Sequence, residues 1–190
     1  MRAEGLRLVA GLGNPGVRYE DTRHNIGFRA LDAWAGVEGW QCDDGAAWKW
    51  HGPPDGRVLC LKPQEFMNVS GPPVARFARR WGIDSTRVLV LHDELDLPAG
   101  RVKLKKRGGT AGHRGLASLV DSLGTSHFPR LRLGIGRPAP GQAVVDFVLE
   151  AFSGAEQPVV SELIANGVAG MELWLASGTD SAMNQLNSGL

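Results

Sequence analysis

The chain has 190 residues, of which 43% are hydrophobic, and this length suits a single domain with a substantial core. Its two cysteines lack the spacing of a zinc site and argue against a disulfide framework, so we expect both to be reduced core residues. The net charge is only +1, but residues 101–137 hold nine Lys or Arg and a single acid, which points to a polyanionic partner such as a nucleic acid.

The apolar pattern predicts alternating strands and helices. In chain order they are a strand (6–12), a helix (24–35), two hairpin strands (46–51 and 57–62) joined by a loop at 52–56, a helix (72–81), two strands (87–92 and 101–106), a helix (114–123), a strand (130–136) and a helix (155–176). This order predicts a single-domain α/β sandwich with a central mixed, mostly parallel β-sheet flanked by helices, over residues 1–178. Residues 179–190 are small and polar, and we expect them to form a loose C-terminal tail.

No segment of the chain predicts a membrane anchor. The N-terminal residues lack the apolar run of a signal peptide. The longest apolar stretch, 158–177, is interrupted by Glu162, Asn166 and Glu172, so we do not expect it to span a membrane. We therefore expect a soluble, cytoplasmic protein.

Two of the predicted strands are basic on one face. Period-two alternation places Arg101, Lys103 and Lys105 on the same face of one strand. The same alternation places Arg130 and Arg132 on one face of the other. If the strands are neighbours, the five charges form one patch that a polyanion would stabilise, whereas the alternative is an ordinary solvated face.

The glycine-rich stretch after the first strand has two functional interpretations. Gly11, Gly13 and Gly16 fit the dinucleotide fingerprint, but no helix is predicted to begin at the third glycine, so we do not expect a dinucleotide. Alternatively, Asn14 and His24 fit a hydrolytic site in which an amide binds substrate and an imidazole activates water. A purely structural glycine turn is the third possibility.

His24 is the strongest candidate for a general base because an imidazole can accept a proton near neutral pH. Asp93 lies at the carboxyl end of the apolar strand 87–92, where α/β sheets place ligand sites, and its carboxylate could orient His24. Asp93, Glu94 and Asp96 could instead bind Mg²⁺, and His24 could be purely structural. The chain has no phosphate-binding loop for a nucleotide.

Two loops carry further polar candidates. Asn68 joins a strand to a helix, where its amide could donate to an oxyanion or orient water, or could simply cap the helix. Residues 108–115 form a glycine-rich loop beside the basic strand that could approach a phosphate or only form a turn.

Taken together, these motifs resemble the bacterial peptidyl-tRNA hydrolase family. The matching segments, in order and spacing, are residues 11–16, 22–25, 66–71, 92–98, 112–116 and 130–136. The resemblance covers nearly the whole chain. It implies a monomeric α/β hydrolase without a cofactor, which cleaves the ester between a peptide and the 3′ ribose of tRNA.

The resemblance also implies roles for individual residues. His24 would be the base and Asp93 its partner, Asn14 would bind the blocked peptide, and Asn68 would position the peptide or the water. Further substrate or tRNA contacts would come from Tyr19, Phe66, Met67, His113, Arg114, Lys105 and Arg132, of which the last two would bind the 5′ phosphate of tRNA.

One position departs from the family pattern. Arg114 stands where the family usually has an asparagine that helps to position substrate and water. A guanidinium has no acceptor atom, so Arg114 could bind a phosphate or polarise a carbonyl but could not replace an amide oxygen. This departure leaves room for an alternative, a non-catalytic RNA-binding relative of the same fold.

Overall fold

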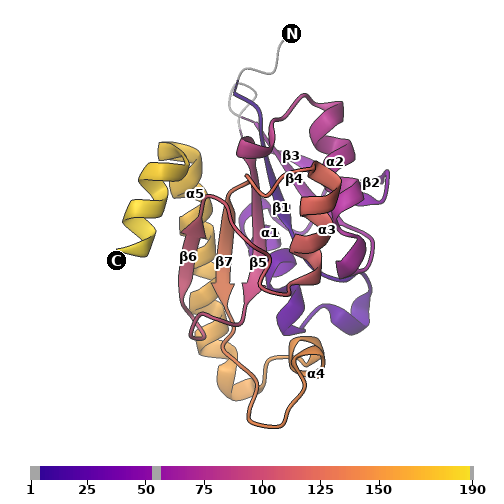
Figure 1. Ribbon diagram of the computed structural model, residues 1–190. Coiled ribbons are helices and arrows are strands. Elements are labelled where there is room, and N and C mark those ends of the chain that lie inside the picture. The colour runs from indigo at the N-terminus through magenta and orange to yellow at the C-terminus, as the bar shows by residue number, and fades with distance from the viewer. Residues whose placement is uncertain (1–4, 53–56, 189–190) are drawn as a thin grey trace.

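The computed structural model describes residues 5–52 and 57–188, and in this part of the chain seven strands form one sheet (Figure 1). The strands are β1 (Arg7–Gly11), β2 (Gln41–Asp43), β3 (Ala46–His51), β4 (Val58–Pro63), β5 (Val88–Glu94), β6 (Val102–Lys105) and β7 (Arg130–Gly134). Their order is β2-β3-β4-β1-β5-β7-β6, and the four central strands are mutually parallel while the outer pairs are antiparallel. The predicted mixed α/β sheet is confirmed.

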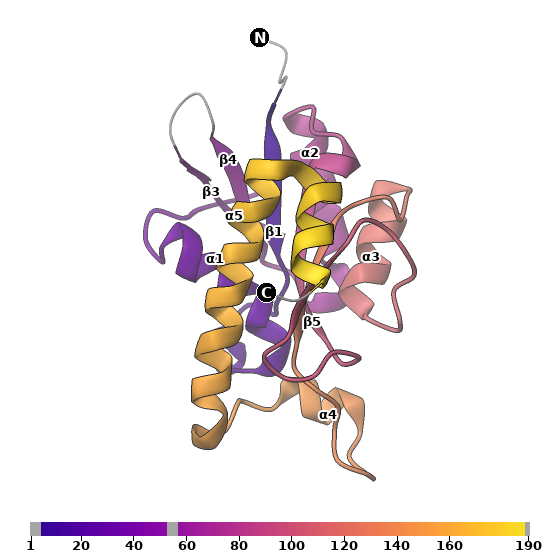
Figure 2. The same cartoon turned by 90° about the vertical axis from the view of Figure 1, so that its left-hand side faces the viewer.

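Helices cover both faces of the sheet. One face packs against α1 (Ile26–Ala35) and the long α5 (Gln157–Asn187), which crosses the sheet in Figure 2. The other face packs against α2 (Gly71–Arg80) and α3 (Arg114–Leu123). The short α4 (Val144–Leu149) lies beyond the carboxyl ends of the central strands.

The glycine turn after β1 lets α1 approach the sheet closely. A Cβ at Gly11 would lie 2.5 Å from the Gly27 carbonyl oxygen, and one at Gly13 would lie 2.7 Å from the Phe28 ring. The turn is followed by a 3-10 turn at Val17–Tyr19, and α1 begins only at Ile26. Gly11 and Gly13 therefore serve close packing in this structure, and only a 3-10 turn, not the α-helix that a dinucleotide site would require, begins after Gly16.

The expectation of a loose tail is wrong for the described residues after 178. The φ of Gly178 is 76°, which kinks α5, but the helix resumes and continues to Asn187. Ala182 is fully buried there, and Asn187 hydrogen-bonds both the amide and the carbonyl of Leu104 in β6. The tail thus packs on the edge of the sheet because apolar residues recur at helical spacing.

The other predicted elements form and differ only at their ends, and two short elements were not predicted. The hairpin β3–β4 forms as predicted, while residues 53–56 of its loop lie outside the described residues. The short elements β2 and α4 were not predicted, and Cys42 in β2 is exposed, so the expectation of two core cysteines holds only for Cys60. By length and composition alone the segment Gly154–Asn187 could cross a membrane, but Leu163, Met171 and Trp174 of α5 are buried in the core against the sheet.

Candidate active site

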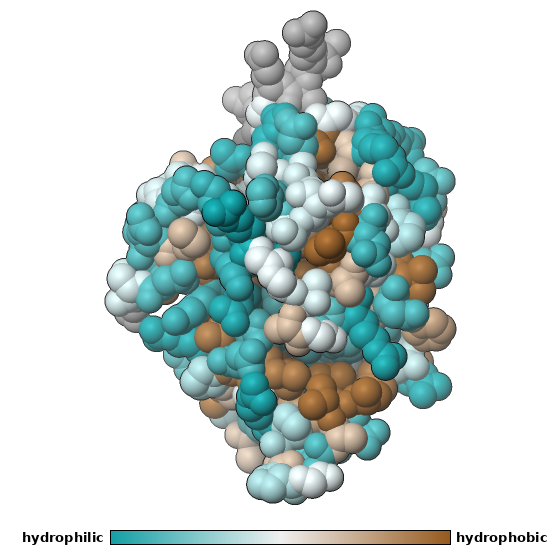
Figure 3. Space-filling view, in the orientation of Figure 1, coloured by the Kyte–Doolittle hydropathy of each residue, from teal (hydrophilic) through white to brown (hydrophobic). Residues whose placement is uncertain are grey.

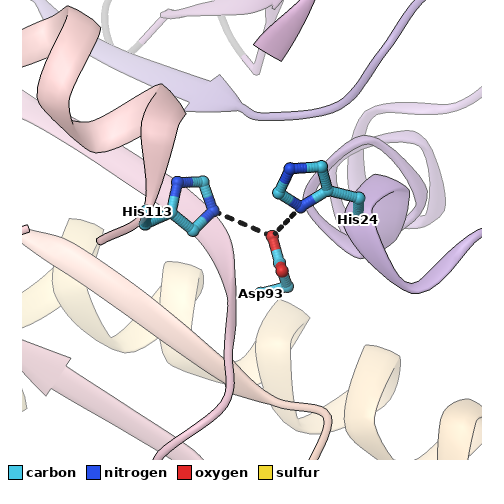
Figure 4. Close-up of side chains that lie close together, drawn as sticks. All are labelled: His24, Asp93 and His113. Carbon is cyan, nitrogen blue, oxygen red and sulfur yellow. Dashed lines mark hydrogen bonds and ion pairs between the residues drawn. The ribbon is translucent and has the colours of Figure 1, made fainter. Parts of the chain in front are cut away.

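Three side chains from separate elements meet at one carboxylate oxygen (Figure 4). His24 lies in a 3-10 turn just before α1, Asp93 near the carboxyl end of β5, and His113 directly before α3. His24 Nδ1 lies 2.9 Å from Asp93 Oδ1, and His113 Nε2 also lies 2.9 Å from the same oxygen. The structure therefore brings the predicted base within hydrogen-bond distance of its predicted partner.

The hydrogen bonds fix the tautomer of both imidazoles. His113 Nδ1 accepts the amides of Gly115 and Leu116 at 3.1 and 3.3 Å, so its proton is on Nε2 and is donated to Asp93. A carboxylate only accepts, so His24 donates from Nδ1. The lone pair of His24 Nε2 is then left available, as a general base requires.

The surroundings of Asp93 keep this carboxylate ionised. The residue is 3% exposed, and burial alone would raise the pKa of its carboxyl. The neighbouring His24 and His113 outweigh burial and hold the pKa well below its usual range. Asp93 can therefore stabilise a positive charge on His24 when that imidazole takes up a proton.

Asn14 is held by a network that also fixes its amide. Its backbone amide and carbonyl hydrogen-bond the side chain of Asn25, both at 2.9 Å. Its Oδ1 accepts the Met67 amide at 2.7 Å. The Nδ2 group is consequently the end that remains for substrate, because no protein acceptor within the described ranges hydrogen-bonds it.

His24 lines two cavities. The larger, here called the histidine cavity, has a volume of about 400 Å³ and contains His24, Asp93, His113 and their neighbours on β5 and in the 110–114 loop. The smaller, here called the amide cavity, has about 220 Å³ and is lined by Asn14, Tyr19, His24, Phe66, Met67, Asn68, Arg114, Val145, Val148 and Leu149. Four residues, His24, Arg114, Val145 and Val148, belong to both.

Most of the predicted site residues thus lie together. Seven of them line the amide cavity, and Asp93 and His113 complete the set in the histidine cavity. Tyr19 and Phe66 meet edge to face there, with ring centroids 6.3 Å apart. Lys105 and Arg132 line neither cavity and lie on the outer strands β6 and β7.

The predicted basic patch forms in part. In the antiparallel pair β6–β7, Lys103 is opposite Arg132 and Lys105 is opposite Arg130, as the alternation predicted. Arg130, however, is 2% exposed and donates to the carbonyls of Gly109 and Ser126, so its inclusion in the patch is wrong. We call Lys103, Lys105 and Arg132 the basic face. Hydrophilic side chains gather over these strands in Figure 3.

The acidic candidates for Mg²⁺ have other partners. Glu94 pairs with Arg132 Nε at 2.8 Å, and Asp96 pairs with Arg137. His24, Asp93 and His113 do offer ligand atoms within 4.8 Å of one another, a spacing that a metal ion could bridge. In the structure the two contacts to Asp93 are instead hydrogen bonds that set the imidazole tautomers.

Sequence reasoning missed two features of the site. It did not predict that His113 shares the Asp93 oxygen, although a histidine before an expected helix in a glycine-rich loop was a usable signal. It also missed α4, which contributes Val145, Val148 and Leu149 to the cavity walls. Exposed apolar residues of α4 belong to the hydrophobic area at the lower centre of Figure 3.

Comparisons with known proteins agree with this geometry. The family model described as peptidyl-tRNA hydrolase matches residues 8–189. The chain is 46% identical over 190 residues to a peptidyl-tRNA hydrolase of Nocardia farcinica, covering 96% of this chain and 97% of that one. It is 42% identical over 188 residues to a peptidyl-tRNA hydrolase of Symbiobacterium thermophilum, covering 96% and 99% of the two chains.

A solved structure gives the same answer. The crystal structure of peptidyl-tRNA hydrolase from Acinetobacter baumannii superimposes with a TM-score of 0.88 at 33% identity, covering 97% of this chain and 95% of that one. These relatives bear an enzyme's name, so the alternative of a non-catalytic RNA-binding relative is not favoured. The family-model match over residues 8–189, the identity to full-length relatives and the shared fold lead to one conclusion: the chain belongs to the peptidyl-tRNA hydrolase family.

Proposed function

We propose that His24 activates the water that hydrolyses the ester between a peptide, or an N-blocked aminoacyl group, and the 3′ ribose of tRNA. The observation that carries this proposal is the 2.9 Å contact between His24 Nδ1 and Asp93 Oδ1. It orients an imidazole whose Nε2 remains available at the junction of the two cavities. The reaction would release tRNA from prematurely dissociated peptidyl-tRNA.

In the proposed reaction His24 carries one proton from the attacking water to the leaving ribose oxygen. Nε2 of His24 takes a proton from water while the water oxygen attacks the carbonyl carbon of the ester. Asp93 stabilises the resulting imidazolium through the proton on Nδ1. The tetrahedral intermediate then expels the ribose oxygen, which receives the proton from Nε2, and the products are a free peptide acid and tRNA.

The amide cavity suits the peptide portion of the substrate. Asn14 Nδ2 would donate to a carbonyl of the blocked peptide, a contact that a free aminoacyl group lacks. Asn68 lines the same cavity and is exposed, so its amide is available to orient the peptide or the water. Tyr19, Phe66 and Met67 would contact the substrate beside it.

The basic face suits the tRNA. Lys105 is exposed. Arg132 donates to Glu94 through Nε, and its two terminal nitrogens would be the donors for a phosphate. Both residues would contact phosphates, with the 5′ phosphate as the family resemblance suggests. We further propose that the protein acts as a cytoplasmic monomer, without a membrane and without a dinucleotide or other cofactor.

Cleavage of matched substrates tests this function. N-acetyl-aminoacyl-tRNA and the same aminoacyl-tRNA with a free amino group differ only in the blocked end that Asn14 would recognise. We expect faster cleavage of the blocked substrate, and a smaller preference in Asn14→Ala. Tight binding of the blocked substrate without cleavage would contradict the proposal in favour of an RNA-binding protein, and equal cleavage of both substrates would contradict the role of Asn14.

A further inference from the structure

The charge of Arg114 has no partner among the described residues. It is the first residue of α3, is exposed, and makes no hydrogen bond or ion pair with residues 5–52 or 57–188. A cation at the start of a helix opposes the helix dipole, which typically costs about 0.3–1 kcal/mol in similar settings. Neither pairing nor helix stability therefore accounts for an arginine at this position.

The position of Arg114 points to a ligand. Arg114 lines both the histidine cavity and the amide cavity, as His24 does. Among the described residues, it is the only Lys, Arg, Asp or Glu in the wall of the amide cavity. An arginine that borders both cavities beside the candidate base is placed to contact a group close to the cleaved bond.

The carboxylates that line the histidine cavity pair with other residues, and within the described part of the chain none of them pairs with Arg114. Asp93 accepts from His24 and His113, Glu94 pairs with Arg132, and Asp96 pairs with Arg137. In the first turn of α3, the amides of Gly115 and Leu116 donate to His113 Nδ1. An anion at this end of the site would therefore be bound by the guanidinium itself.

We propose that Arg114 binds the phosphate that links the last two nucleotides of the tRNA. This inference rests on the proposed function, because it takes His24 as the point where the ester is cleaved. The terminal ribose carries the ester at its 3′ oxygen and this phosphate at its 5′ oxygen. It is thus the nearest anion that every substrate shares, whatever its peptide, and a guanidinium is well shaped to bind it.

A substrate with a neutral linkage tests the contact. We would compare N-acetyl-aminoacyl-tRNA carrying the natural phosphodiester with the same molecule carrying a methylphosphonate between the last two nucleotides. For the unmodified enzyme we expect kcat/KM to fall roughly 10- to 100-fold on the neutral substrate, the range of a charge-assisted hydrogen bond. Arg114→Gln should lose a similar factor on the natural substrate and nothing further on the neutral one.

Two further variants sharpen the comparison. Arg114→Lys keeps the charge and should retain part of the preference for the natural linkage. Arg79→Gln removes an exposed arginine of α2 that lines neither cavity, and should keep the full preference. If Arg114→Gln instead slows both substrates equally and keeps the full preference, Arg114 acts on the ester carbonyl and the proposal is overturned.

A binding measurement separates this proposal from the proposed function. Uncharged tRNA with the two linkages has no ester, so its affinity reports the phosphate contact alone. We expect a preference for the natural linkage that disappears in Arg114→Gln. An equal affinity for both linkages would overturn the contact, whereas failure of the unmodified enzyme to cleave the natural ester would contradict only the proposed function.

Discussion

Two histidines hydrogen-bond the same carboxylate oxygen but differ in whether their second ring nitrogen is occupied. Asp93 Oδ1 accepts from both His24 and His113 at 2.9 Å. The second nitrogen of His113 is occupied by amides at the start of α3, whereas that of His24 is available in the cavity. At the scale of single residues, this asymmetry makes His24 the candidate base and His113 a positioning residue for Asp93.

A third histidine should make the protein sensitive to acid. His92 is 2% exposed, and burial, with a smaller contribution from His113, lowers the pKa of its imidazole to about 3. An unfolded histidine titrates near 6.5, so below about pH 6.5 the unfolded chain binds a proton that the folded chain does not. The free energy of unfolding should therefore fall as the pH drops from about 6.5 toward 3, by up to about 1.4 kcal/mol per pH unit.

Urea unfolding between pH 4.5 and 7.5 measures this effect above the range in which the carboxyl of Asp93 titrates in the unfolded chain. His92→Gln should reduce the slope of stability against pH by about one proton. The exposed His127 provides a matched control, and His127→Gln should leave the slope close to that of the unmodified protein. A His92→Gln variant with the unmodified slope would show that His92 is not kept neutral by burial.

The sequence indicated the individual residues of the site better than their contacts. Asn14 and Asp93 stand at the ends of predicted strands and His24 at the start of a predicted helix, so an approach of the three at one edge of a parallel sheet could be expected. The pairing of Glu94 with Arg132 depends on the strand order, in which β7 lies beside β5, and no local pattern encodes that order. The catalytic and binding roles themselves stay predictions.

At the scale of elements, the basic residues of the pair β6–β7 differ in burial, from the exposed Lys105 to the buried Arg130. Alternation along the sequence places Lys105 and Arg130 on a common face only if their strands are neighbours, and the β6–β7 register meets that condition. Burial distinguishes them, because Arg130 donates to loop carbonyls and lies over the Phe128 ring, while Lys105 is exposed at the end of β6. Alternation alone cannot report which charged residue a neighbouring loop covers.

The basic face should determine how tRNA binding depends on salt. Lys105→Ala and Arg132→Ala should each weaken binding and reduce the slope of log affinity against log salt by roughly 0.7–0.9 for a full phosphate contact. We expect the larger change in Lys105→Ala, because Glu94 already neutralises part of Arg132. Arg79→Ala, on α2, is the control, and an unchanged slope in both test variants would exclude phosphate contacts by these residues.

Long elements with a clear period were predicted well, and short ones were not. All seven residues of β5 are buried, and the apolar run over its first four positions, 88–91, identified that strand. In contrast, α4 is six residues long, too short for a helical period to show, and β2 has three exposed residues. The polar composition after Gly178 hid a helical segment whose few apolar residues, Ala182, Met183 and Leu186, pack against the core on the face of the sheet that α1 and α5 cover.

At the scale of the whole molecule, the C-terminal end of α5 covers one of the two edges of the sheet, the one formed by β6. β6 is the last strand, and Asn187 hydrogen-bonds the Leu104 amide at 3.1 Å and the Leu104 carbonyl at 2.9 Å. Lys106 adds an ion pair with Asp180 beside it. An uncovered edge strand invites pairing with another chain, so these contacts protect the protein against aggregation.

Replacing Asn187 tests this closure. Asn187→Ala leaves the two backbone groups of Leu104 without their side-chain partner, and we expect a loss of stability of about 1–2 kcal/mol and a greater tendency to aggregate on heating. Asn184→Ala, an exposed position in the same part of α5, should change neither property as much. Equal stability and solubility in both variants would show that the edge needs no cover from α5.

The most direct test of the central claim is the rate of the cleavage step without His24. Single-turnover cleavage of N-acetyl-aminoacyl-tRNA would be compared for the unmodified protein, His24→Ala and the control His127→Ala, with tRNA affinity measured alongside. The account predicts that His24→Ala slows cleavage roughly 10²- to 10⁴-fold with little change in affinity, while the control keeps its rate. Equal cleavage rates in His24→Ala and the unmodified protein would contradict it.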